Sequence, residues 1–88
     1  MSTIWKIPLT IQDTQQIMLP KGYEFLHVDM QGFQLWMWVI LNPEAEKLPV
    51  TIVVKGTGHW INEDYDFLHL GTVLTLDGLV WHVFEELV

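Results

Sequence analysis

The chain has 88 residues, enough for one small domain, and it combines 50% hydrophobic residues with 11 carboxylates, four lysines and no arginine. The net charge of −7 argues against binding to nucleic acid or to an anionic membrane surface, because both attract basic proteins. Cysteine is absent, and we find neither a signal-like segment nor an apolar run that could span a bilayer, so we expect a protein of the reducing cytoplasm.

Short apolar runs separated by turn signals recur along the chain, and no segment keeps a helical period, so the pattern indicates an all-β fold. In the first run Trp5, Ile7, Leu9 and Ile11 share one face. Pro8 interrupts that run and lacks an amide donor, which favours a position at the edge of a sheet.

The run 33–41 is apolar on both faces, which predicts cover on both sides, from the second layer or from a neighbouring molecule. Gln31-Gly32 and Asp77-Gly78 are typical of tight hairpins. The order predicts a single β domain over residues 1–88, a small antiparallel sandwich or barrel of about seven strands, largely a meander. The predicted strands are 4–11, 15–19, 24–30, 33–41, 49–55, 67–76 and 79–86.

The apolar content also predicts self-association. Half of the residues are hydrophobic and five are tryptophans, whereas a domain of this length buries only about 60–65% of the surface of its unfolded chain. The surplus apolar surface must either form an exposed patch or be covered by a second subunit. We favour the second interpretation and expect a homo-oligomer.

The longest irregular stretch, 56–66, contains the candidate binding site, because loops on a rigid sheet often carry binding residues. Its Gly-Thr-Gly-His-Trp sequence offers close backbone approach, an anion-binding concavity of amides, a hydroxyl, a titratable ring and a stacking face. Such a set could hold a nucleotide, with one lysine as the nearest cation. The alternative is a simple turn whose tryptophan folds back onto the core. The candidate ligand-binding residues are Lys55, Gly56, Thr57, Gly58, His59 and Trp60.

Catalytic and metal-binding groups are scarce. Ser2 is the only serine, so nucleophilic catalysis lacks candidates, and a base formed by His59 with Glu63 or Asp64 would be a chance pairing in an acidic loop. We therefore expect no enzymatic activity. A zinc site would need the strand histidines to meet in the right register, so we expect neither metal nor cofactor. The loop acids, Asp66 included, are interpreted as a solvated face, or alternatively as a site for a cation or a basic protein.

A resemblance extends over nearly the whole chain. The sequence opens with Ile4-Trp5-Lys6-Ile7-Pro8-Leu9, carries Gly56-Thr57-Gly58-His59, and ends with Val80-Trp81-His82-Val83-Phe84-Glu85-Glu86. This pattern resembles a family of small uncharacterised proteins of tailed bacteriophages and prophages, which carry a Gly-Thr-Gly-His loop and a closing Val-Phe-His-Val-Phe-Glu-like strand. The resemblance implies an accessory phage protein in the cytoplasm of the infected host bacterium. It does not imply any particular activity.

Taken together, the residues and the resemblance predict a non-enzymatic counter-defence protein that binds and sequesters a small ligand, above all a nucleotide immune signal. A polyanionic ligand would meet a chain of charge −7 without arginine, which lacks bidentate phosphate contacts. One alternative is an inhibitor that binds a host defence protein through an acidic and aromatic surface. Another is a structural virion-associated protein. A ligand sponge needs a concave site containing a lysine, and an inhibitor needs a flat exposed aromatic patch.

Overall fold

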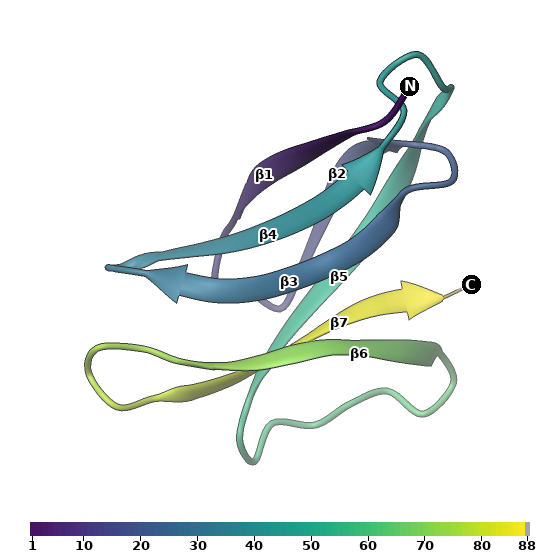
Figure 1. The fold of residues 1–88 in the computed structure, drawn as a ribbon. Helices are drawn as coiled ribbons and strands as arrows, with labels where there is room; N and C mark the ends of the chain where they lie inside the picture. Colours follow the sequence, from purple (N-terminus) through teal and green to yellow (C-terminus); the bar gives the residue numbers. More distant parts are fainter. Residues whose placement is uncertain (88) are drawn as a thin grey trace.

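The computed structural model describes residues 1–87 and contains seven antiparallel β-strands in two sheets (Figure 1). This confirms the predicted all-β fold and agrees with a small sandwich. Each strand begins and ends within about two residues of its predicted bounds. The strands are β1 (Thr3–Leu9), β2 (Thr14–Pro20), β3 (Glu24–Gln31), β4 (Gln34–Leu41), β5 (Lys47–Gly56), β6 (Asp66–Leu74) and β7 (Val80–Leu87).

The connectivity differs from the predicted meander. The first sheet has the order β1-β4-β3 and the second has the order β2-β5-β7-β6. Only β3–β4 and β6–β7 are neighbours both in sequence and in a sheet. The β5–β6 connection stays within the second sheet but passes over β7, and the other three connections pass from one layer to the other. The reason is that alternating side chains specify which face of a strand is buried, but they do not specify the partner strand. Pro8 does lie on an edge strand, as predicted, because β1 is the outer strand of the first sheet.

The core lies between the two sheets. From β4, the side chains of Leu35, Met37 and Val39 point inward and are at most 1% exposed. They pack in one cluster with residues of the second sheet that include Ile52 and Val83. Strict alternation along β4 therefore provides the apolar face that holds the two layers together.

The sheets meet along β3 and β6, and both strands are irregular there. The register of β3 shifts between Phe25 and His27, and that of β6 shifts between His69 and Gly71. Such bulges bend a strand and increase its twist. A Cβ atom on Gly71 would lie 2.5 Å from a methyl carbon of Val28, so the close approach of the two strands requires glycine at this position.

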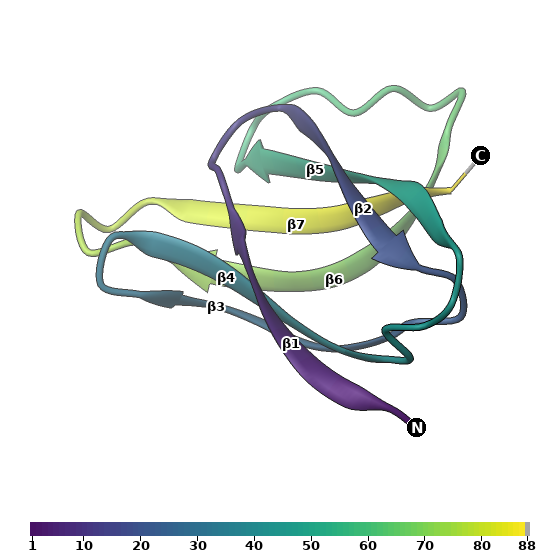
Figure 2. The ribbon, with the colours of Figure 1, turned by 90° about the horizontal axis from the view of Figure 1, so that it is seen from above.

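Three connections gather at one end of the sandwich. The β3–β4 and β6–β7 hairpins project from this end (Figures 1 and 2), and their turns contain Gly32 and Gly78 with positive φ angles of 61° and 87°, as the hairpin signals predict. The β1–β2 connection reaches the same end, where Ile11 and Phe33 line one hollow. Ile11 was expected within the first strand, on the same face as Leu9, but β1 ends at Leu9.

Candidate functional site

The candidate loop connects two strands that are not neighbours. β5 ends at Gly56, which is opposite Trp81 near the start of β7, and β6 begins at Asp66, which is opposite Leu87 at its end. Residues 57–65 must therefore travel along the whole of β7. Figure 1 shows this loop on the side of the second sheet that faces away from the first sheet.

The loop begins with a tight turn stabilised by its own histidine. The amide of His59 donates to the carbonyl of Gly56 (3.0 Å), and the amide of Gly56 donates to Nδ1 of the same histidine (3.1 Å). The imidazole meets Trp81 edge-on, with 5.9 Å between ring centroids. A Cβ atom on Gly56 would lie 3.0–3.2 Å from these two rings, so the folded-back histidine depends on glycine.

A hollow lies between this turn and the β6–β7 hairpin. Its volume is about 500 Å³. We call it the Trp81 hollow. A second hollow of about 260 Å³ adjoins it and shares Leu79 and Trp81; we call it the tip hollow. Concave, mostly apolar sites with a few polar groups are typical of small-molecule binding. The other residues of the Trp81 hollow are Gly56, Thr57, His59, Gly78 and Val80.

Trp81 lines both hollows and leaves one polar group without a partner. Its indole packs against the core, and Nε1–H is buried without any hydrogen-bond acceptor within residues 1–87. A buried polar group without a partner costs about 1–3 kcal/mol, and such groups are uncommon enough to need an explanation. Trp81 therefore gives both hollows an aromatic wall, while its N–H is closed off from solvent.

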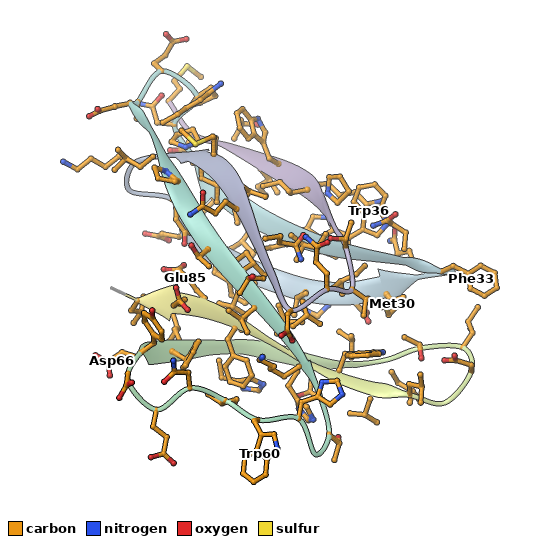
Figure 3. All side chains as sticks on the ribbon, turned by 180° about the vertical axis from the view of Figure 1, so that it is seen from behind. Met30, Phe33, Trp36, Trp60, Asp66 and Glu85 are labelled. Carbon is orange, nitrogen blue, oxygen red and sulfur yellow. The ribbon has the colours of Figure 1, made fainter. Side chains whose placement is uncertain are left out.

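The predicted site residues divide into two groups. Gly56, Thr57 and His59 line the Trp81 hollow together, and Gly58, with φ of +92°, forms the turn between them. Trp60 is 91% exposed and points away from the body of the protein (Figure 3). Trp60 therefore does not fold back onto the core, and it does not line the Trp81 hollow.

The predicted cation is also displaced from the site. Nζ of Lys55 lies 3.0 Å from Oδ1 of Asp13, which comes from the β1–β2 connection. This lysine extends toward β2, and neither hollow has a lysine among its lining residues. The tip hollow instead contains Asp77, whose pKa is lowered mainly by a hydrogen bond from the Thr75 hydroxyl. The site is therefore poorly suited to a ligand with several phosphates.

Two of the four histidines meet through threonines on the outer face of the second sheet. His82 contacts the Thr57 hydroxyl through Nε2 (2.9 Å) and the Thr72 hydroxyl through Nδ1 (3.0 Å). The same Thr72 hydroxyl lies 3.1 Å from Nε2 of His69. This chain of hydrogen bonds fastens the start of the loop to β7 and β6, because Thr72 and His82 are cross-strand partners.

Among the residues that the structure describes, His59 forms no ion pair with Glu63 or Asp64. Nδ1 of His59 accepts from the Gly56 amide, and the amide of Asp64 donates to the Asn62 side chain, while Glu63 is exposed. Within residues 1–87, no three histidine or carboxylate side chains come together in a way that could hold a metal ion. The same part of the chain contains no helix long and apolar enough to cross a membrane.

The sequence matches, over residues 1–88, the model of a family described as a domain of unknown function, DUF7352. The chain belongs to this family. Comparison with curated proteins and with solved structures gave no match. Because the family description names no activity, the function of this DUF7352 protein has to be argued from its site.

Sequence reasoning missed the β6–β7 hairpin as part of the site. Leu79 and Trp81 lie 20 and 22 residues beyond His59, the last residue of the Gly-Thr-Gly-His turn, and they reach it only because β7 pairs with β5. The Asp77-Gly78 signal did locate the hairpin, but no local pattern relates one turn to another. An estimate of strand pairing would have been needed to find Trp81.

Proposed function

We propose that this DUF7352 protein is a non-enzymatic binding protein that captures a small planar ligand of low charge in the Trp81 hollow. The observation that carries the proposal is the Trp81 ring, which lines two adjoining and mostly apolar hollows. Thr57 and His59 supply the neighbouring polar groups, and Leu79 and Val80 supply apolar cover. A planar ligand would bury apolar area against the Trp81 ring.

Within this proposal, a nucleotide-type molecule remains the ligand class that we favour. A nucleobase is planar, packs against aromatic side chains and carries hydrogen-bond acceptors. The absence of lysine from both hollows restricts the class to nucleosides and nucleotides with few phosphates, whose charge stays in solvent. The biological role that we propose is sequestration of such a signal during phage infection.

Titration of the purified protein tests the proposal. Isothermal titration calorimetry and native mass spectrometry would compare adenosine, cyclic mononucleotides, cyclic dinucleotides and ADP-ribose. We expect binding to weaken as phosphates are added. Trp81→Phe retains an aromatic ring with a smaller surface, and we expect it to weaken binding about fivefold, the equivalent of about 1 kcal/mol of apolar contact. His59→Ala should weaken binding as well.

Trp60→Ala is the matched control, because this tryptophan is in the same loop but is exposed. We expect its affinity to equal that of the parent protein. If Trp60→Ala abolishes binding while Trp81→Phe retains it, the ligand does not occupy the Trp81 hollow. If none of these nucleotides binds, the proposed ligand class is wrong.

A second candidate function is inhibition of a host defence protein. It is favoured by exposed apolar side chains at the hairpin tips, where Phe33 is 90% and Leu76 is 69% exposed, because such side chains can anchor a protein interface. Figure 3 shows Phe33 extending beyond the sheets. This function predicts a stoichiometric complex with one purified defence protein that Phe33→Ser weakens and His59→Ala leaves unchanged.

A further inference from the structure

The walls of the tip hollow are mostly apolar and come from all three connections at this end of the sandwich. Ile11 lies in the β1–β2 connection, Phe33 in the β3–β4 turn and Leu76 in the β6–β7 turn. Met30 of β3 and Trp81 of β7 complete the apolar wall, and Figure 3 shows Met30 and Phe33 at this end of the molecule. Two aromatic rings and a methionine thioether therefore line one small space.

Within residues 1–87, Asp77 is the only charged side chain that lines this hollow. The Thr75 hydroxyl donates a hydrogen bond to its Oδ1 and thereby lowers the pKa of the carboxyl, so the group is ionised at neutral pH. In the same part of the chain, no lysine or histidine lies within salt-bridge distance of this carboxylate. The tip hollow thus carries a negative charge that has no positive partner.

A carboxylate beside aromatic rings is a combination of groups that attracts an organic ammonium ion. The opposite charge draws the cation in, and aromatic faces bind quaternary ammonium groups through cation–π interactions. Apolar walls favour the burial of the alkyl groups. The volume of the hollow, about 260 Å³, is below the ~300–1,000 Å³ that is usual for a drug-sized ligand. It therefore suits an ammonium head group with a few carbon atoms.

We propose that the tip hollow is a second binding site, which takes a small organic ammonium ion. The ammonium group lies beside the Asp77 carboxylate, and its alkyl groups contact the Phe33 and Trp81 rings. This inference goes beyond the proposed function, because the Trp81 hollow has no carboxylate among its lining residues. The charge of Asp77 also makes the tip hollow unfavourable for an anionic ligand.

The exposure of Phe33 fits this role. Its side chain is 90% exposed, and it is outside the cluster of residues that forms the core. The ring can therefore turn over a bound cation without disturbing the packing between the sheets. Burial of this ring against the alkyl groups would add to the stability of the complex.

Choline and 3,3-dimethylbutan-1-ol are the probes that test this proposal, because the two molecules have the same shape and only choline is charged. NMR titration of the ¹⁵N-labelled protein measures both affinities, with sodium chloride at equal concentration as the control for ionic strength. We expect choline to shift the amide signals of residues 75–79. We also expect it to bind about fivefold more tightly than the alcohol, as an exposed charge pair allows.

Two variants assign this preference to the side chains of the hollow. Asp77→Asn removes the charge but keeps an oxygen for the Thr75 hydroxyl, and asparagine is also a common turn residue. We expect this variant to bind choline and the alcohol equally. Phe33→Leu keeps an apolar side chain without the aromatic face, and it should weaken choline binding about threefold.

Asp66→Asn is the matched control, because it removes a carboxylate at the opposite end of β6 (Figure 3). It should leave the affinity for choline unchanged, and thermal unfolding confirms that each variant is folded. Equal affinities of the parent protein for choline and the alcohol would overturn the proposal. So would a preference for choline that survives Asp77→Asn, or unshifted signals of residues 75–79 at tens of millimolar choline.

Discussion

Gly71 occupies the position where a single methyl group decides whether β3 and β6 can approach. A Cβ atom there would lie 2.5 Å from Val28, whose side chain is only 5% exposed. We expect Gly71→Ala to lower the free energy of unfolding by about 1–3 kcal/mol, the usual cost of overpacking a core. Urea denaturation measures this change.

A double-mutant cycle separates the clash from other effects of the substitution. Val28→Ala alone leaves a cavity, but it also makes room for the new methyl group. The double variant should therefore be more stable than the sum of the two single changes predicts. Strictly additive losses would show that Val28 is not the obstacle at Gly71.

Folding favours the neutral form of the Glu85 carboxyl by raising its pKa. Burial raises the pKa of its carboxyl above 4.5, and the hydroxyl of Tyr23 donates a hydrogen bond to it. The folded protein therefore keeps a proton at a pH where the unfolded chain has lost it. This contribution to stability is complete below the unfolded pKa, and it is lost as the pH rises through the folded pKa.

We expect Glu85→Gln to be more stable than the parent at pH 7, because the amide still accepts from Tyr23 and carries no charge that burial disfavours. The loss of stability with rising pH above 4.5 should also be smaller in this variant. Thermal unfolding from pH 4 to pH 8 measures both effects. Glu86→Gln is the control for net charge, and an equal gain at that position would contradict a specific role of Glu85.

Among the elements, the β6–β7 hairpin is the most sensitive to a backbone change at its turn. Gly78 has a φ angle of +87°, and a Cβ atom at this position would meet no other atom within 4 Å, so only the backbone opposes a side chain. We expect Gly78→Ala to cost about 1–2 kcal/mol, since residues with a Cβ are disfavoured in the left-handed region. Gly78→Asn should cost less, because asparagine visits this region more readily.

Urea denaturation gives the two free energies. Amide hydrogen exchange at Gly78 and Leu79 reports opening of the hairpin, because both amides donate hydrogen bonds to Thr75. If the alanine and asparagine variants lose the same free energy of unfolding, backbone strain at the positive φ of residue 78 is not the cause of the loss. Because Leu79 lines both hollows, loosening this hairpin should also lower the affinity of the Trp81 hollow for any ligand.

The elements also show what the sequence could and could not predict. Strand positions and both hairpins were predictable, because alternation and the glycine turns at 32 and 78 are local signals. Gly56, Thr57 and His59 line one hollow, and their closeness was predictable because they are almost consecutive in the sequence. The position of Trp81 beside the Gly-Thr-Gly-His turn and the contact of Lys55 with Asp13 were not predictable, because both join residues that are distant in sequence. Such contacts depend on the whole fold.

At the scale of the whole molecule, the pairing pattern predicts slow folding. Three of the five strand pairings, β1–β4, β2–β5 and β5–β7, join strands that are not consecutive. Their loops must close before the contacts can form, so we expect folding in milliseconds to seconds. Stopped-flow tryptophan fluorescence measures the rate, and complete folding within microseconds would contradict this expectation.

The convergence of separate turns at one end of the sandwich has a consequence for how binding preference can change. The β1–β2 connection, the two hairpin turns and the Gly-Thr-Gly-His turn all contribute to the adjoining hollows, while the core that holds them comes from the strands. Relatives can therefore exchange one turn at a time and acquire new targets without rebuilding the interior. The same division makes this end a natural place to diversify residues when selecting binders in the laboratory.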